Sequence, residues 1–423
     1  PPFVSDQAEA KGIVEDAKLL NMLVRNYYFN RDNKVGARDQ YDWTQGIWGN
    51  FSSGSTQALI GVRVDAFGYL GVKLDGGVGT SGSGNMSRSD TVHADGSRDV
   101  NESQGKAGGA VKVRISKTDL KFGEMQPSTA PVYAVGGSRI LPQTATGFQL
   151  QSSEVKDLDL EAGHFYSASS QDKNASDGGQ FATYAGVEAN SPYDYFGGKY
   201  AIIENLSASL YGAKLQDIWN QYYAYLNYTI PFGGDESLYL DGNIYNTQDN
   251  GDAKAGEISN AAYCLAAAIS IMQAHTTSPA FQRVNGDTPF DYIGVGKNNR
   301  GRDSIFLANS NQYSDFYAPG EKSAQVRYDL KMAEYGVPGL SFMTRYVKGW
   351  DIDGTKTPVG SPYAGLYGED GKHNDNNFEA KKVVQSGPAK DVSFRIRQAW
   401  HVANGEEGEG DTKEIRLIVD YPL

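Results

Sequence analysis

Two arginines placed two residues apart give this chain its clearest chemical signal. In the segment DVSFRIRQAWHV, which covers 391–402, Arg395 and Arg397 fall on one side of an alternating pattern, while Phe394 and Ile396 fall on the other. Guanidinium groups bind carboxylates through charge-assisted hydrogen bonds. Because neighbouring strands lie about 4.8 Å apart, basic residues on adjacent strands can form a continuous ladder that attracts anions.

The same alternation recurs along most of the chain and predicts many two-faced β-strands. Apolar residues occupy every second position in five further segments: 59–76, 107–116, 205–212, 237–246 and 414–423. Polar connectors rich in Gly, Asn and Asp separate such segments. The connectors are short at 231–237 and 385–391 and long at 76–106, 167–180, 284–317 and 349–377. No linker divides the chain, so we expect one domain over 1–423 with one elaborated end.

Two architectures explain strands of this kind. In a soluble sheet the apolar face packs on a core, whereas in an outer-membrane barrel it faces lipid and the polar face meets a watery lumen. At roughly 23 residues per strand and connection, the chain would form about eighteen strands. Full charges in mid-strand favour the barrel, as do aromatic residues near the expected strand ends. These aromatic residues are Tyr27, Tyr28, Phe29, Tyr222, Tyr223 and Tyr421.

The barrel architecture decides where the arginines must point. An arginine that faces lipid at the bilayer midplane costs about 2–4 kcal/mol. Arg395 and Arg397 are therefore expected to face the lumen, and Arg416 on the final strand adds a third positive charge. A narrow pore focuses local charge more than net charge, so an acidic protein can have a selective basic lumen.

Composition narrows the function classes. The formal charge of −12, from 39 basic and 51 acidic residues, argues against a nucleic-acid-binding surface. Cys264 is the single cysteine, which excludes a disulfide within the chain and zinc binding by several cysteines. The chain has no run of about 18 apolar residues, so the sequence predicts no transmembrane helix. The first residues lack a signal-peptide pattern, which indicates either a cytosolic protein or a mature, processed chain.

Long motifs then indicate a family. They include FVSDQAEAKG (3–12), RNYYFNRD (25–32), GGSRILPQTATGFQLQSSE (136–154), VVQSGPAKDVSFRIRQAWH (383–401) and RLIVDYPL (416–423). From end to end the chain resembles the OprD family of substrate-specific outer-membrane porins, and most closely its OccD branch of basic-amino-acid porins. The resemblance implies an all-β, eighteen-stranded, antiparallel transmembrane barrel in the outer membrane of a Gram-negative bacterium. It also implies that the third loop, here 118–150, folds inward to form the constriction.

The resemblance further implies two sets of site residues. A basic ladder for substrate carboxylates comprises Arg31, Arg139, Lys381, Arg395, Arg397 and Arg416. A constriction group comprises Tyr184, Tyr292, Ser310, Tyr313 and Asp315, in which Asp315 holds the cationic end of a substrate. The chain departs from the family pattern at Gln40, where an arginine is expected, so one rung of the ladder is in doubt. Without the resemblance, the residues favour other readings, with Tyr184 and Tyr292 as interface aromatics and Asp315 as the partner of a loop lysine.

The sequence therefore predicts a channel and not an enzyme. It would admit small carboxylate-bearing nutrients by passive diffusion, namely basic amino acids or short peptides, and by resemblance carbapenem antibiotics. A porin that prefers non-basic carboxylates or dipeptides is the alternative. We expect the protein to contact outer-membrane lipid and lipopolysaccharide and to be a monomer or a weak homotrimer. We expect it to bind neither a cofactor nor nucleic acid.

Other classes of protein stay open. A soluble β-rich binding or adhesion module has the same strand pattern. A serine protease proposed in this family would use His164, Asp217 and Ser304, but no nucleophile elbow surrounds the serine. The histidines at 93, 164, 275, 373 and 401 lack metal-ligand spacing, so no metal is expected. The segment DNGDAKAGE (249–257) could bind calcium, although an exposed polar turn explains it better.

Overall fold

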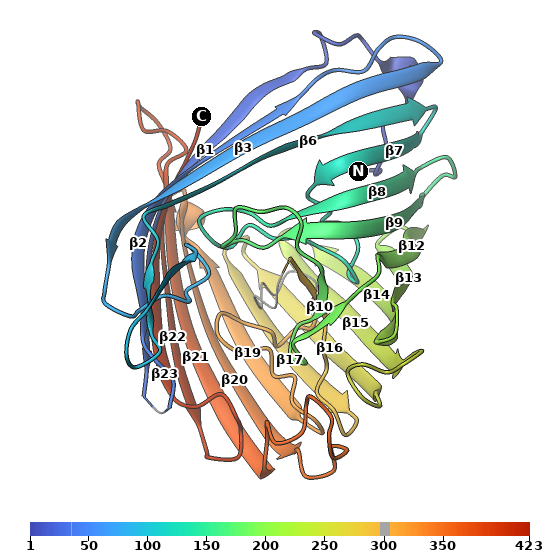
Figure 1. The fold of residues 1–423 in the computed structure, drawn as a ribbon. Helices are drawn as coiled ribbons and strands as arrows, with labels where there is room; N and C mark the ends of the chain where they lie inside the picture. The colour runs from blue at the N-terminus through green and yellow to red at the C-terminus, as the bar shows by residue number, and fades with distance from the viewer. Residues whose placement is uncertain (35, 297–304) are drawn as a thin grey trace.

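The computed structural model describes residues 1–34, 36–296 and 305–423. Eighteen of its strands form one antiparallel sheet that closes on itself as a barrel (Figure 1). Each strand pairs with its neighbours in chain order, and the last strand, β23 (Thr412–Pro422), pairs with the first, β1 (Lys18–Asn33). Closure satisfies the backbone hydrogen bonds that an open edge would leave unpaired, as a structure surrounded by lipid requires.

The remaining wall strands are β2 (Gln40–Ser52), β3 (Ile60–Gly76), β6 (Ser103–Ile115), β7 (Thr118–Met125), β8 (Thr144–Ser152), β9 (Leu158–Ser169), β12 (Tyr193–Ile203), β13 (Leu206–Leu215), β14 (Trp219–Gly233), β15 (Glu236–Asp249), β16 (Ser259–Ile271), β17 (His275–Asn285), β19 (Lys322–Lys331), β20 (Leu340–Asp353), β21 (Glu369–Val383) and β22 (Ser393–Ala403). Short strands in the connections are β4 (Arg88–Val92), β5 (Arg98–Val100), β10 (Gln180–Ala182), β11 (Val187–Ala189) and β18 (Ile293–Val295). Two 3₁₀-helices, η1 (Gln7–Glu9) and η2 (Met332–Tyr335), complete the described elements. Neither has the length and apolar character that would let a helix cross a membrane.

The two faces of the wall match the alternation of the sequence. On β22, Phe394 is 50% exposed, and Ile396 shares its outward direction. Arg395 and Arg397 lie on the opposite face, where both contact Glu379 of the neighbouring strand β21. The expectation that these arginines face the lumen is confirmed, because the outward positions are apolar and exposed.

The two ends of the barrel differ in their connections. At one end the links are short, as at 116–117, 204–205 and 234–235. At the other end they are long, as at 77–102 and 286–321. Outer-membrane barrels place short turns in the periplasm and long loops outside the cell, so the long connections mark the outer mouth.

The segment 126–143 crosses the lumen between β7 and β8. Side chains of the wall hold its backbone carbonyls from two sides. The Trp48 indole donates to the Ile140 carbonyl at 2.6 Å, and the Tyr245 hydroxyl donates to the Pro131 carbonyl at 2.9 Å. The two strands that carry these donors, β2 and β15, lie half-way around the ring from each other. Irregular backbone at membrane depth is tolerated only when protein satisfies it, as it is here.

Two expectations need correction. The range 118–150 is too wide for an inward loop, because its ends form the wall strands β7 and β8, where the alternation continues. Tyr27, Phe29 and Tyr223 do not belong to an interfacial girdle, since they point inward and are buried. Tyr222 does point outward and is exposed, because successive strand residues face opposite sides.

Candidate functional site

Basic side chains descend one wall of the lumen along four neighbouring strands, β1, β23, β22 and β21. The pairing register places Arg31 nearest the outer mouth, then Arg416 directly opposite Arg397, and then Arg395 directly opposite Lys381 nearer the periplasmic end. Arg139 joins this row from segment 126–143, where its Nε donates to the carbonyl of Ser83 at 2.7 Å. The structure thus brings all six predicted basic residues to one side of the lumen.

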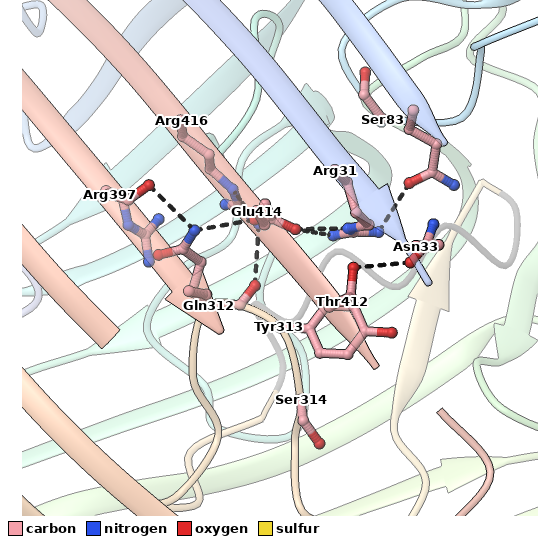
Figure 2. Close-up of polar contacts among 12 residues, drawn as sticks. Arg31, Asn33, Ser83, Gln312, Tyr313, Ser314, Arg397, Thr412, Glu414 and Arg416 are labelled. Atoms are coloured by element: carbon pink, nitrogen blue, oxygen red, sulfur yellow. Dashed lines mark hydrogen bonds and ion pairs between the residues drawn. The ribbon is translucent and has the colours of Figure 1, made fainter. Parts of the chain in front are cut away.

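Glu414 lies at the centre of the upper part of this row, and its side chain is fully buried (Figure 2). Its Oε2 accepts from the Nε of Arg31 at 2.6 Å, and its Oε1 accepts from the Nε of Arg416 at 2.6 Å. The side-chain amide of Gln312 donates to Oε1 at 3.1 Å. One carboxylate therefore fixes two guanidiniums and one residue of the long connection 286–321.

Phe29 packs among the guanidiniums of this row. The central carbons of Arg31, Arg139 and Arg416 lie 5.2, 5.4 and 5.3 Å from its ring centroid. Guanidinium groups are attracted to the negative face of an aromatic ring, and each such contact contributes about 0.5–2 kcal/mol. Phe29 therefore allows three like charges to gather where hydration is reduced.

Glu379 is the acidic partner of the basic side chains lower in the lumen. It contacts Arg395, and one of its oxygens lies 3.5 Å from the Nε of Arg397. The side chain of Arg395 is 37% exposed, and Lys381 opposite it is exposed as well. These two cations are accessible in the lower lumen, whereas the side chain of Arg416 is only 4% exposed.

The predicted constriction residues gather around Asp315, which is completely buried. Its Oδ1 accepts from the Ser310 hydroxyl at 2.6 Å, and its Oδ2 accepts from the hydroxyls of Tyr184 and Tyr292, the latter at 3.4 Å. Gln282 of the wall holds this part of the chain by donating to the Asp315 carbonyl at 3.1 Å. The carboxylate thus faces hydroxyl groups and not the open lumen.

Tyr313, the fifth predicted constriction residue, packs beside the basic row. The guanidinium of Arg31 lies 5.1 Å from its ring centroid. Its hydroxyl donates to the Glu409 carbonyl at 3.2 Å. Tyr317, which the sequence did not single out, stacks on Tyr184 with ring centroids 3.7 Å apart.

Members of both groups line a common cavity of roughly 600 Å³. Its basic lining comes from Arg31, Arg88 and Arg139, and its acidic lining from Asp172 and Glu409. Its aromatic lining comes from Tyr184, Tyr313, Tyr317 and Tyr367. Gln40, at the position of the missing arginine, also lines the cavity and accepts from Nη1 of Arg31 at 3.0 Å. A molecule in this space can therefore contact guanidinium, carboxylate and phenol groups.

Buried Asp291 supports the aromatic side of the cavity. Its carboxylate accepts from the backbone N–H groups of Tyr184, Ala185 and Tyr292 at 2.8, 3.1 and 2.9 Å. It also accepts from the Tyr363 hydroxyl at 2.6 Å. Burial nevertheless raises the pKa of Asp291 to about 6, because the desolvation penalty on the charged form exceeds the gain from these donors.

Sequence reasoning missed the acidic partners of the ladder. Glu414 stands two residues before Arg416, and Glu379 stands two residues before Lys381, so each pair shares one face of a strand. The spacing of Glu414 and Arg416 could have predicted their ion pair, whereas the contacts of Glu379 with Arg395 and Arg397 depend on the pairing of β21 with β22. Glu409 carries no comparable signal, because it lies in the irregular connection between β22 and β23.

The structure also places residues of the two alternative sites, the proposed protease triad and the possible calcium-binding segment 249–257. The carboxylate against His164 belongs to Asp194, at 2.6 Å, whereas Asp217 accepts from the Asp252 N–H at 3.0 Å. Ser304, the proposed nucleophile, lies outside the described residues. In 249–257, Asp249 accepts from the Ile258 N–H at 2.8 Å, which is ordinary turn capping.

Two of the histidines that lack metal-ligand spacing along the sequence come together in the structure. His373 and His401 lie on the neighbouring strands β21 and β22, and their ring nitrogens are 2.8 Å apart. Glu407 and Glu409 are close to both rings.

Comparisons with known proteins agree with this architecture. A family model described as outer membrane porin, OprD family, matches residues 11–423. Porin D of Pseudomonas aeruginosa is 62% identical over 426 residues, covering 100% of this chain and 94% of that protein. The porin-like protein GalP of Pseudomonas putida is 33% identical, with coverage of 99% and 94%. The crystal structure of Pseudomonas aeruginosa OprD matches with a TM-score of 0.86 at 57% identity, covering 100% of this chain and 99% of that chain. Pseudomonas aeruginosa OpdK matches with a TM-score of 0.84 at 32% identity, with coverage of 97% and 100%.

Proposed function

Since the chain belongs to the OprD family of porins in the outer membrane of Gram-negative bacteria, we propose that it conducts small zwitterions with a carboxylate and a cationic end. Basic amino acids and short peptides are the substrates that fit best. The observation that carries this proposal is a cavity whose lining includes both the guanidiniums of Arg31 and Arg139 and the rings of Tyr184 and Tyr317. The family and the barrel point to a channel and not to an enzyme.

The carboxylate of the substrate would enter beside Arg31 and Arg139. Both guanidiniums line the cavity, and Glu414 and Phe29 hold them in place. The carboxylate would then pass the field of Arg416 and reach the exposed pair of Arg395 and Lys381. Several weak sites in series permit flux, because a single tight site would retain the solute.

The cationic end would contact Tyr184 and not Asp315 directly. Asp315 is buried and is not among the residues that line the cavity, whereas Tyr184 lines the cavity and donates its hydroxyl proton to Asp315. A phenol oxygen whose proton is given to a carboxylate becomes a better acceptor for an ammonium or guanidinium group. Asp315 thus sets the polarity of the surface that the cation meets.

Uptake by proteoliposomes tests this assignment. Asp315→Asn keeps the shape of the side chain but removes its charge. We expect a several-fold slower uptake of lysine and arginine, with uptake of acetate or glutamate changed much less. Asp90→Asn, at an exposed position in a long connection, is the matched control. Equal losses for lysine and glutamate would contradict the role of Asp315 in recognising the cation.

A preference for non-basic carboxylates is the second candidate. OpdK, 32% identical to this chain, has been solved with vanillate, an aromatic carboxylate. The basic row of this chain would serve such solutes equally well, and faster uptake of vanillate than of lysine would favour this candidate. Carbapenem antibiotics, which carry a carboxylate, would follow the same row.

We also propose that one chain forms a complete pathway, as a monomer or in a weak homotrimer. All strands of the ring come from a single chain, so the described lumen needs no partner to close it.

A further inference from the structure

Four side chains of the outer mouth form a compact group at the edge of the solute cavity: His373, His401, Glu407 and Glu409. One ligand atom from each lies within 4.8 Å of the others. His373, His401 and Glu407 are buried, and Glu409 reaches the cavity surface. Imidazole nitrogens and carboxylate oxygens are the donors that divalent first-row metal ions bind in proteins.

The hydrogen bonds fix which ring atoms point inward. His401 Nδ1 lies 2.6 Å from the Gly410 carbonyl, which can only accept, so this nitrogen carries the hydrogen. The Nε2 of a neutral His401 then presents a lone pair to His373 Nδ1 at 2.8 Å. His373 Nε2 lies 2.6 Å from Glu321 Oε2 and donates to it.

A neutral His373 would therefore also present a lone pair at Nδ1. The Oε1 atom of Glu407 lies 3.1 Å from the same nitrogen. Three acceptor atoms thus converge in a buried space, and acceptors repel one another unless a cation lies between them. Either a proton or a metal ion can satisfy this geometry.

The outer contacts of the group favour a metal ion. Histidines that bind metals usually donate their second ring nitrogen to a carboxylate or a backbone carbonyl, which fixes the tautomer and the ring orientation. Here Glu321 does so for His373 and Gly410 for His401. Glu407 is oriented as well, because its Oε2 accepts from the N–H groups of Glu409 and Gly410 at 2.8 and 3.2 Å.

We propose that His373 Nδ1, His401 Nε2 and the carboxylates of Glu407 and Glu409 bind one divalent transition-metal ion, with Zn²⁺ as the best match. Ligand atoms of a tetrahedral zinc site lie about 3.3 Å apart at bond lengths near 2.0–2.1 Å. The separations of 2.8 and 3.1 Å in this group need to widen by only a few tenths of an ångström. The ion can reach the site from the cavity, where Glu409 is accessible.

The site is connected to the part of the constriction that carries Asp315. The ring of Phe316 stacks on His373 with centroids 4.2 Å apart, and the ring of Tyr313 lies 4.8 Å from that of His401. The hydroxyl of Ser314 donates to Glu409 Oε1 at 2.5 Å. A bound ion would therefore clamp 313–316 to the wall strands β21 and β22, a consequence that does not depend on which solute the channel conducts.

Metal binding to the full chain in detergent tests the proposal. The protein is first treated with a chelator and dialysed, and Zn²⁺ uptake is then measured by equilibrium dialysis with elemental analysis. We expect one Zn²⁺ per chain. Co²⁺ in its place should give the visible d–d absorption of a low-symmetry nitrogen and oxygen site. Hydrogen exchange in 309–317 should slow when Zn²⁺ is added.

Variants separate this site from adventitious binding. His401→Gln and Glu407→Gln should each lower Zn²⁺ affinity at least tenfold, and Glu321→Gln should lower it about ten- to hundredfold through the loss of ring orientation. His93→Gln is the control, since His93 also contacts a carboxylate, that of Asp99 at 2.9 Å, but far from the group in sequence. Glu409→Gln, at the accessible edge, provides a milder change if a buried variant does not fold. Absence of Zn²⁺ binding, or equal binding by the wild type and His401→Gln, would overturn the proposal and leave a shared proton between the rings.

Discussion

Arg31 and Glu414 form an ion pair across the seam where the first and last strands close the barrel. They are direct partners in the β1–β23 register, and Nη2 of the arginine lies 2.5 Å from Oε2 of the glutamate. The same carboxylate accepts from Arg416. The seam of the fold and the upper end of the basic row are therefore one structure, so changes at Glu414 should affect both stability and conduction.

Glu414→Gln should destabilise the barrel by about 3 kcal/mol, because it leaves two guanidiniums beside a buried neutral group. Urea unfolding of the protein in lipid vesicles measures this change. Glu102→Gln is the matched control: Glu102 pairs with Lys73 at 2.9 Å, but its side chain is 84% exposed. An exposed pair contributes about 0–1 kcal/mol, so equal effects of the two changes would contradict the assignment.

Replacing Arg395 and Arg397 together by Gln should lower anion selectivity. The change removes two lumenal cations and leaves Glu379 without the two guanidiniums that contact it. One charge acts with about 1 kcal/mol at 4 Å in water, which corresponds to a factor of about five in permeability. The reversal potential of a planar bilayer under a salt gradient measures this. Arg98→Gln, at an exposed position in an outer connection, should leave the potential unchanged.

Arg25→Gln should raise single-channel conductance. Nη1 of Arg25 donates to the carbonyls of Gly137 and Arg139 at 2.7 and 2.9 Å, while its Nε is held by Asp420 at 2.8 Å. Without these donors, segment 126–143 loses an anchor and can move away from the lumen axis. Faster proteolysis within this segment should accompany the larger conductance; unchanged conductance together with unchanged proteolysis would argue against the anchor.

The buried carboxyl of Asp291 predicts a pH dependence of stability. Its pKa rises from an ordinary value of 3.8 to about 6 on folding, so the folded state binds the proton more tightly than the unfolded state. Its contribution to stability is therefore most favourable below about pH 4, falls as the pH rises towards 6, and is constant above that. The total fall is roughly 3 kcal/mol at 1.36 kcal/mol per pH unit.

Asp291→Asn removes the titratable carboxyl group. The variant is therefore the reference against which the pH dependence of the wild-type stability is measured. Thermal unfolding in detergent, followed by circular dichroism between pH 4 and 7.5, gives the melting temperatures of both proteins. The difference between wild type and variant should shrink, or change sign, as the pH rises through 5 and 6. A difference that stays constant would show that the carboxyl does not titrate in this range.

Local sequence pattern determined which residues face lipid and which face the lumen. Alternation along 391–402 placed Arg395 and Arg397 inside, because strand geometry repeats every two residues and lipid excludes guanidinium groups. The same reasoning misjudged Tyr27 and Phe29. Their aromatic character suggested an interface, but the period of two assigns both to the lumenal face, where the structure buries them.

Tertiary structure decided everything that depends on pairing between distant segments. The register of β22 and β23 sets Arg397 opposite Arg416, and the seam sets Arg31 opposite Glu414. The path of 305–321 brings Asp315 to Tyr184. The resemblance implied this last group, but no pattern within the sequence predicts such a path, since an irregular connection has no period.

The histidine pair shows the same division most clearly. His373 and His401 are 28 residues apart, a spacing that suggests no metal site when it is read along the chain. Both lie on lumenal positions of adjacent antiparallel strands, which alternation alone could establish. Only the hydrogen-bonded register between β21 and β22 makes them diagonal neighbours, with His373 opposite Ala403 and His401 opposite Asp375. The offset of two strands depends on the turn that joins them and on the whole ring that it must fit.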